Sequence, residues 1–245
     1  MIFEICVDSV AGVRAAKAAG ANRVELCGNL LEGGVTPSRG AMRQARTVAG
    51  IGLHVMIRPR GGDFLFDGDE FAEMRADIET AKAEGADGVV IGLLTAGGTI
   101  DIPRTRELIA LARPLSVTFH RAFDMTPDPL SALETLVELG VDRVLTSGQE
   151  ATVLEGLPLL TELIGRAGKR IVVMPGGGIT ARTIDRILAA AKPSEVHFAA
   201  LEPSASAMRF RRQRVFMGGE LRPPEYDRLV TSADSIRSVM AKASD

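Results

Sequence analysis

Short apolar runs alternate with longer amphipathic runs along the first two hundred residues. Eight of the short runs are rich in β-branched or aromatic residues, which is typical of buried strands. They are IFEICVD (2–8), NRVELC (22–27), GLHVMI (52–57), DGVVIGLL (87–94), LSVTFH (115–120), DRVLTS (142–147), RIVVMP (170–175) and EVHFAA (195–200). The first seven are each followed by a segment with helical spacing. The pattern therefore predicts eight βα-type units within residues 1–200.

One junction between helix and strand recurs, as AAGANRVEL (18–26), AEGADGVVI (83–91) and ELGVDRVLT (138–146). In each, a helix ends at a glycine, the residue best suited to a left-handed C-terminal position. Strands that are separated by helices lie parallel, and eight such units close most naturally into a barrel. The alternative is a doubly wound open sheet, which usually has a glycine-rich turn after its first strand. Here that turn reads CVDSVAGV, so we expect an α/β fold, a TIM-like (β/α)₈ barrel.

Residues 201–245 lie outside this repeat and form a C-terminal extension. The segment LEPSASAMRFRRQRVFMGGELRPPE (201–225) is predicted to be irregular. YDRLVTSADSIRSVMAKAS (226–244) has the spacing of an amphipathic helix that packs on the barrel, as a candidate for the eighth helix. The basic run RFRRQR (209–214) favours a solvated loop, or a lid that brings Arg209 to the barrel mouth, over a nucleic-acid patch. The whole chain is expected to be a single domain.

Composition narrows the classes of function. The chain has 245 residues, is 46% hydrophobic and has a net charge of −2, which argues against nucleic-acid and acidic-membrane partners. No uninterrupted apolar stretch of about 18 residues exists, so no transmembrane helix is expected. Glu4 and Asp8 lie where a signal peptide would be basic and then apolar. Cys6 and Cys27 are therefore interpreted as free thiols in a cytoplasmic protein.

The segment MIRPRGGDF (56–64) directs attention to the barrel mouth. In such barrels the active site lies at the carboxyl ends of the strands, and this loop follows the third strand. Pro59 cannot extend a strand ladder. Arg58 and Arg60 are suited to a carboxylate or phosphate, with Asp63 close by. The alternative is a surface loop that holds an internal Arg–Asp pair.

Other strand ends carry similar chemistry. TFHRAFD supplies His120, Arg121 and Asp124, and ELCGNLLEGG supplies Glu25 and Cys27. Two late glycine loops, TSGQE and MPGGGIT, can present backbone N–H groups to an anion next to a helix, with Thr180 as a plausible N-cap. The predicted anion-binding residues are Ser147, Gly148, Gly176, Gly177 and Gly178.

Alternation along the strands assigns side chains to the barrel interior. Glu4, Cys6 and Asp8 share one phase, Glu25 shares a phase with Cys27, and all three histidines fall on the polar phase of a strand. Glu4 and His54, early in their strands, favour a buried structural network. Residues nearer the upper ends are better placed for general acid–base work on a small anion. The catalytic candidates are Asp8, Glu25, Arg58, Arg60, Asp63, His120, Arg121, Asp124 and His197.

Six blocks of sequence closely resemble the CutC family of copper homeostasis proteins. They are EICVDSV, RVELCGNLLEGGVTPS, MIRPRGGDF, ARPLSVTFHRAFDMTPDPL, RVLTSGQE and MPGGGIT, and the resemblance covers about residues 2–200. In the closing segment His197, Met208 and Arg209 match the family pattern. The arginine that the family has after the eighth strand is absent, and Arg212 replaces an asparagine.

The resemblance implies a cytoplasmic barrel that forms a homo-oligomer, a dimer or tetramer, and handles copper. It implies Cu(I) binding at Cys6 and Cys27, with no organic cofactor. Soft thiolates suit Cu(I), although a buried cysteine is most often a small core residue. The alternative is a barrel enzyme, or a binder of a small anionic metabolite, that uses the arginine-lined mouth. Both hypotheses remain open at the level of sequence.

Overall fold

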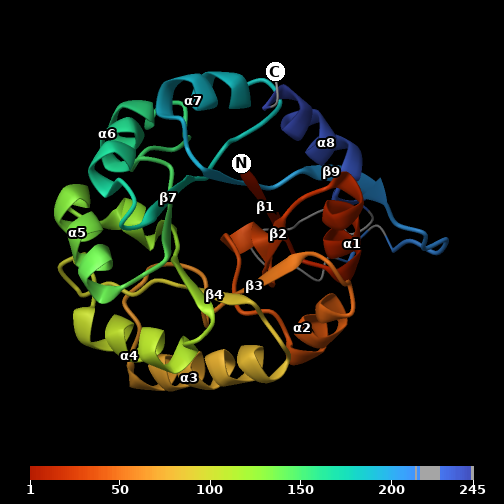
Figure 1. Cartoon of the computed structure of the whole chain (residues 1–245). Coiled ribbons are helices and arrows are strands. Elements are labelled where there is room, and N and C mark those ends of the chain that lie inside the picture. Colours follow the sequence, from red (N-terminus) through yellow and green to blue (C-terminus); the bar gives the residue numbers. More distant parts are fainter. Residues whose placement is uncertain (213, 216–226, 244–245) are drawn as a thin grey trace.

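The computed structural model describes residues 1–212, 214–215 and 227–243. Eight parallel strands surround one axis, as predicted (Figure 1). They are β1 (Ile2–Val7), β2 (Arg23–Leu26), β3 (Gly52–Met56), β4 (Gly88–Ile91), β5 (Ser116–Phe119), β6 (Arg143–Thr146), β7 (Val172–Pro175) and β8 (Glu195–Phe198). The sheet order runs from β7 down to β1 and then to β8. A parallel bridge between Gly176 and His197 links β7 to β8 and brings the barrel near closure.

A ring of helices covers the outside of the strands (Figure 1). They are α1 (Val10–Ala19), α2 (Arg39–Arg46), α3 (Gly68–Ala83), α4 (Ile102–Ala112), α5 (Pro129–Leu139), α6 (Leu157–Ala167) and α7 (Ile184–Ala191), with short 3₁₀ turns η1 (Leu30–Glu32) and η2 (Arg121–Met125). The main core lies between the strands and this ring and includes Ile5, Val55 and Phe119, all fully buried. Parallel strands are apolar on this face, which explains why the runs were visible in the sequence.

Local signals fix where the helices begin and end. Ser9 caps α1 by accepting a hydrogen bond from the Gly12 N–H, and Asp67 forms a capping box with Glu70 at the start of α3. At the predicted helix–strand junctions, Gly20 has φ = 89° and Gly140 has φ = 73°, left-handed values that favour glycine. One capping prediction is wrong, because the N-cap of α7 is Thr183 rather than Thr180.

The C-terminal extension is more regular than predicted. Its first residues form β9 (Leu201–Ala205), which pairs antiparallel with β10 (Asp227–Thr231). Residues 227–231 were expected to be helical, and helix α8 (Ala233–Lys242) begins only after this strand. Helix α8 contacts both α1 and α7 and so fills the eighth place in the outer ring. Residues 213, 216–226 and 244 of the predicted irregular and helical segments lie outside the described residues.

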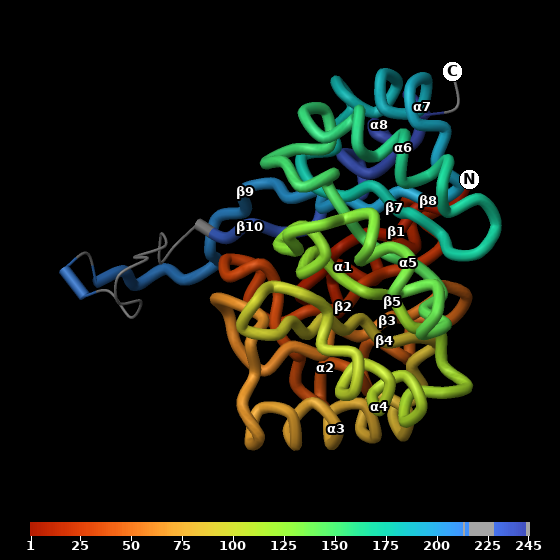
Figure 2. Tube along the Cα trace, turned by 90° about the vertical axis from the view of Figure 1, so that its left-hand side faces the viewer, coloured from red at the N-terminus to blue at the C-terminus, as the bar shows by residue number. Residues whose placement is uncertain are grey.

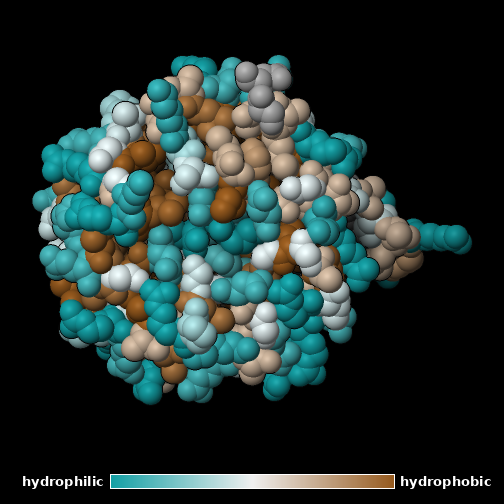
Figure 3. Space-filling model, viewed as in Figure 1, coloured by the Kyte–Doolittle hydropathy of each residue, from teal (hydrophilic) through white to brown (hydrophobic). Residues whose placement is uncertain are grey.

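Residues 206–212, which follow β9, form an arm that projects from the barrel on the side opposite to the N-terminus (Figure 2). Arg209, Met208 and Phe210 are exposed on this arm, and Arg209 does not line the barrel cavity. The rim of the opposite face is mainly hydrophilic, as expected for helices whose apolar sides contact the strands (Figure 3). Among the described residues, no helix is long and apolar enough to cross a membrane.

Candidate functional site

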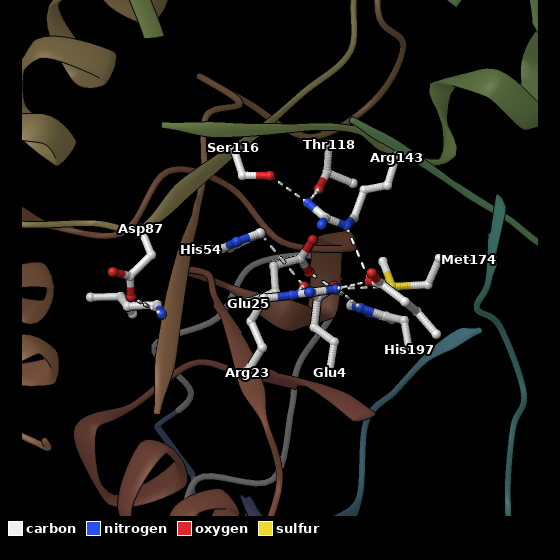
Figure 4. Close-up of polar contacts among 12 residues, drawn as sticks. Glu4, Arg23, Glu25, His54, Asp87, Ser116, Thr118, Arg143, Met174 and His197 are labelled. Carbon is white, nitrogen blue, oxygen red and sulfur yellow. Dashed lines mark hydrogen bonds and ion pairs between the residues drawn. The ribbon is translucent and has the colours of Figure 1, made fainter. Parts of the chain in front are cut away.

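The lower barrel interior, near the amino ends of the strands, holds a buried ion-pair network of Glu4, Arg23, Arg143 and Glu195 (Figure 4). Arg23 pairs with Glu4 through Nε, and its Nη2 lies 2.5 Å from Glu195 Oε2. Arg143 Nε lies 3.1 Å from the same oxygen of Glu195. We call these four residues the lower network. Each of the two guanidiniums of the lower network therefore has a carboxylate partner, which offsets the cost of removing its charge from water.

Two histidines adjoin the lower network through Glu4. His197 Nδ1 lies 2.8 Å from Glu4 Oε1, whereas His54 Nδ1 lies 3.6 Å from Glu4 Oε2. The predicted association of Glu4 with His54 is thus present, with His54 as the weaker neighbour. Burial raises the pKa of Glu4, but the His197 hydrogen bond and the charge of Arg23 outweigh it and hold that pKa low. Burial lowers the pKa of His54 to about 4, so His54 is neutral.

Above this network lies a cluster of two thiols and one carboxyl group, from β1, from β2 and from Cys27, which directly follows β2. Cys6 Sγ lies 3.9 Å from Cys27 Sγ, and each sulfur lies 3.4 Å from Glu25 Oε2. The register explains the contact, because Cys6 is the direct neighbour of Glu25 across the parallel pair. His197 completes the group, with Nε2 3.8 Å from Glu25 Oε2. The shared interior phase of Cys6, Glu25 and Cys27 is confirmed.

The thiol cluster favours one thiolate beside one thiol. The hydrogen bond with Cys27 lowers the pKa of Cys6 to about 5, and His197 adds to this effect. That same contact and burial raise the pKa of Cys27 well above its usual value. Burial lowers the pKa of His197, but the nearby charge of Glu25 and the bonds to Cys6 and Glu4 together raise it. Burial also raises the pKa of Glu25.

The donor atoms of this region are close enough to hold a metal ion. Those of Cys6, Glu25 and Cys27 lie within 4.8 Å of one another, and so do those of Glu4, Glu25 and His197. An ion bound at about 2.3 Å from each sulfur, the distance typical of zinc–thiolate bonds, allows a sulfur–sulfur separation of up to about 4.6 Å. The observed 3.9 Å falls within this range. Two sulfurs form the soft donor set that suits Cu(I).

The upper barrel opens into a cavity of about 400 Å³. We call it the upper cavity. Several sequence-predicted site residues meet on its wall: Cys6, Glu25, Arg58, His120, Arg121, Gly176, Gly177, Gly178 and His197. Phe64, Met56 and Leu30 add apolar surface. A concave, largely apolar space with a few polar groups is the usual form of a small-molecule site.

Arg58 ties the loops of the cavity wall together. Its Nη1 donates to the carbonyls of Glu32 (2.8 Å) and Gly34 (2.9 Å), and its Nη2 donates to the carbonyl of Gly62 (2.9 Å). Its Nε has no hydrogen-bond partner among the described residues. Burial lowers the pKa of Arg58. The predicted placement of this arginine at the mouth is therefore correct, but most of its donors bind backbone.

Arg60 and Asp63 do not reach the upper cavity, contrary to expectation. Arg60 Nη2 lies 3.1 Å from Asp63 Oδ1, and its Nε lies 2.5 Å from Glu70 Oε1. Because glycines 61 and 62 turn the chain outward, Asp63 is exposed. For these two residues the structure shows the alternative interpretation, a surface loop that holds an internal Arg–Asp pair. Asp8 is also exposed and outside the cavity wall, because β1 ends before it.

Asp124 organises the loop after β6 and does not line the cavity. It accepts hydrogen bonds from the N–H groups of Ser147 (3.1 Å) and Gln149 (3.1 Å), while Gly148 N–H donates to Thr146 Oγ1 (2.9 Å). The predicted anion-binding amides of Ser147 and Gly148 are therefore already occupied.

Other groups of the two late loops are also paired. Gly176 N–H donates to the carbonyl of Thr146 (3.0 Å), so it is committed as well. Arg121 pairs with Asp124 at 2.7 Å and with Ser147 Oγ at 2.7 Å, at the cavity wall. Gly177 and Gly178 line the cavity and have φ values of 129° and 71°. Of the predicted anion-binding residues, these two remain the best placed to contact a ligand.

Sequence reasoning missed Arg23, Arg143 and Glu195. Each lies at the start of a strand, where a charged residue is easily interpreted as exposed. The alternation of side chains along a strand could have found two of them. Arg23 lies two residues before Glu25 and Glu195 lies two before His197, so each shares the inward face of a predicted site residue.

Comparison with known proteins places this geometry in a family. The model of the CutC family matches residues 1–202. The copper homeostasis protein cutC homolog of Mus musculus is 51% identical over 244 residues, covering 100% of this chain and 90% of the relative. The homolog of Homo sapiens is 50% identical, covering 99% of this chain and 89% of the relative.

Solved structures agree with the fold. A structure titled as a copper homeostasis protein CutC from Streptococcus agalactiae superposes with a TM-score of 0.77 at 34% identity, over 81% of this chain and 98% of that one. N-(5'-phosphoribosyl)anthranilate isomerase from Pyrococcus furiosus has a TM-score of 0.59 at 14% identity, over 100% and 98% of the two chains, which shows a shared barrel fold alone. The match over most of the chain and the identity to the mammalian relatives lead to one conclusion: this chain belongs to the CutC family.

Proposed function

We propose that the protein binds Cu(I) through Cys6 and Cys27 as part of copper homeostasis. The observation that carries this proposal is the 3.9 Å separation of the two sulfurs at the upper ends of neighbouring strands. The names of the mammalian and streptococcal relatives, which refer to copper homeostasis, support it. Copper is the cargo in this proposal, and the chain supplies soft donors and a partly enclosed place for it.

The surroundings of the thiols suit a cuprous ion. Cys6 reaches the cavity wall, whereas Cys27 is 2% exposed and does not line it. An ion would therefore enter from the upper cavity and meet Cys6 first. Glu4 holds His197 through Nδ1, so the other ring nitrogen faces Glu25 and the thiols. Such neighbours orient metal ligands and tune their basicity.

The test is a competition titration of Cu(I) against a chromophoric Cu(I) chelator, under anaerobic conditions. The wild type should withdraw one equivalent of Cu(I) from the chelator. The double variant Cys6→Ala, Cys27→Ala should withdraw none. His120→Phe is the matched control, because it changes the same cavity without touching a sulfur. Retention of full affinity by the double variant would refute the proposal.

We also propose that the protein acts in the cytoplasm as a homo-oligomer. A reducing compartment keeps neighbouring thiols such as Cys6 and Cys27 free. The projecting segment after β9 exposes Met208 (61%) and Phe210 (67%), a form of apolar surface that is typical of subunit contacts. Light scattering coupled to gel filtration should give a mass above that of one chain for the wild type. Phe210→Asp should shift the mass toward one chain, and a wild-type monomer would contradict the proposal.

A further inference from the structure

Three arginines among the described residues are buried in the barrel interior, and they differ in how their charge is compensated. Arg23 and Arg143 each contact a glutamate of the lower network. Arg58 is as deeply buried, at 6% exposure, yet within the described part of the chain it forms no ion pair, and its contacts are backbone carbonyls. A buried cation without a counter-charge is costly. The wall of the upper cavity thus holds a guanidinium with no carboxylate in direct contact, and the charge of Glu32 acts on it only from a distance.

His120 adds a second donor on the same wall. Its Nδ1 accepts a hydrogen bond from the Ala122 N–H at 3.1 Å, so Nδ1 carries no proton. In the neutral ring the proton is then on Nε2, and Nε2 has no partner among the described residues. Burial, aided by the charge of Arg58, lowers the pKa of His120 to about 3. His120 is therefore a neutral hydrogen-bond donor whose N–H group is unused.

Phe64 connects the two unused donors. The guanidinium carbon of Arg58 lies 5.1 Å from the centre of the Phe64 ring, and the ring of His120 lies 5.0 Å from it. Arg58 Nε and His120 Nε2 are both closed off from solvent. Phe64 itself is half-buried and lines the upper cavity. It follows Gly61 and Gly62, the latter at φ = 82°, so its loop contains residues that allow the backbone to turn.

We propose that Arg58 and His120 form a binding site for the carboxylate or phosphate group of a small organic molecule, with the Phe64 ring as its cover. When the ring moves aside, Arg58 Nε–H and His120 Nε2–H donate to the anionic oxygens. The ligand supplies an anionic oxygen in direct contact with Arg58, which no carboxylate among the described residues does. The rest of the molecule occupies the upper cavity, whose volume of about 400 Å³ limits it to a small metabolite.

This site is distinct from the two thiols in residues and in chemistry. It uses hard nitrogen donors for an anion, whereas Cys6 and Cys27 offer soft sulfur for a cation. The proposed anion site therefore does not depend on copper binding. A protein without the thiols should still bind the anion, and a protein without His120 should still bind Cu(I).

Isothermal titration calorimetry with two probes tests the proposal. The probes are inorganic phosphate and malonate, and glycerol is the neutral comparison. Wild type should bind at least one of the two anions and not glycerol. A hydrogen bond to a charged group contributes about 1.5–3 kcal/mol, so His120→Phe should weaken binding by about tenfold or more. Cys6→Ala, Cys27→Ala should bind the anion as the wild type does.

His54→Phe is the matched control for His120→Phe. His54 is also buried at 4% exposure and also faces a glycine of the fourth strand, Gly88, as His120 faces Gly92. It does not line the upper cavity, so its loss should leave anion affinity within about twofold. Phe64→Ala should uncover the donors and speed association of the anion, measured by stopped flow. The proposal is overturned if neither anion binds at about 10 mM, or if the two histidine variants lose affinity equally.

Discussion

The lower network and the wall of the upper cavity contain the same kinds of side chain, but the charged groups of the network are paired and several groups of the cavity wall are not. In the lower network, both arginines contact carboxylates and Glu4 also accepts a bond from His197. In the upper cavity, Arg58 Nε, His120 Nε2 and Glu25 Oε1 have no hydrogen-bond partner among the described residues. Buried polar groups are normally paired. The difference supports a structural role for the four residues of the lower network and the proposed ligand site in the upper cavity. His54 Nδ1, which adjoins the network, is unpaired as well.

Position along the strands explains the difference. The lower residues lie in the first half of their strands and contact one another across the barrel interior. The upper residues follow or end their strands, where the loops diverge and leave open volume. A polar residue near the carboxyl end of a barrel strand thus has fewer protein partners and more contact with a ligand.

The largest effect should come from breaking the lower network. Glu4→Gln removes the carboxylate that faces Arg23 and His197, and a buried pair that loses one partner costs about 3–5 kcal/mol. Urea unfolding monitored by circular dichroism should show this loss of unfolding free energy, or the variant should fail to fold. Glu134→Gln is the surface control, because Glu134 pairs with Arg170 in solvent, and it should change little. Equal effects in both variants would remove the contrast between buried and exposed pairs.

The next effect concerns pH. His120 has a pKa of about 3 when folded, and the ordinary value is 6.5. Between these values the unfolded chain binds more protons, so stability falls as pH drops below about 6.5. The slope from one histidine is at most about 1.4 kcal/mol per pH unit.

The measurement for this pH effect is urea unfolding at several pH values between 4 and 7. Removing the ring nitrogens in His120→Phe should make stability less dependent on pH than in the wild type. An unchanged slope would mean that His120 is charged when folded.

Substituting alanine for a glycine that packs on a histidine, once beside the lower network and once at the upper cavity, should sharpen the comparison between the two regions. A Cβ at Gly88 would lie 2.5 Å from His54 Nε2, and one at Gly92 would meet the His120 ring. Overpacking costs about 1–3 kcal/mol. Gly88→Ala should lower the free energy of unfolding by an amount near the top of this range, because His54 adjoins the lower network. Gly92→Ala should lower the free energy of unfolding by an amount near the bottom of this range, because the upper cavity gives His120 room to move. Thermal unfolding of both variants tests this order, and the reverse order would contradict it.

The smallest effect on stability and ligand affinity is expected for Arg60, which lies outside the upper cavity. Arg60→Gln breaks the pairs with Asp63 and Glu70, which are partly exposed, and such pairs contribute less than about 1 kcal/mol. Its affinity for malonate should equal that of the wild type, since Arg60 does not line the cavity. A large loss of affinity would instead place Arg60 in the site.

The barrel could be predicted from the sequence because each strand is a short apolar run between helical segments. The β9–β10 hairpin was missed, because LEPSA (201–205) contains a proline and little alternation, and because its partner follows a long separation. Arg58 and His120 were correctly expected at the mouth, since both directly follow buried runs. The sequence could not reveal which amides were occupied. Asp124 takes up the Ser147 and Gln149 N–H groups only once the loop after β6 folds.

The late position of α8 in the chain has a consequence for synthesis. The outer ring contains a helix from the far side of the hairpin, packed between the first and seventh helices through Ile236 and Val239. Until α8 packs, the faces of α1 and α7 that it contacts are uncovered at one seam. Ile236 and Val239 are buried in this seam, so its apolar surface is covered only once the part of the chain beyond the hairpin has been made.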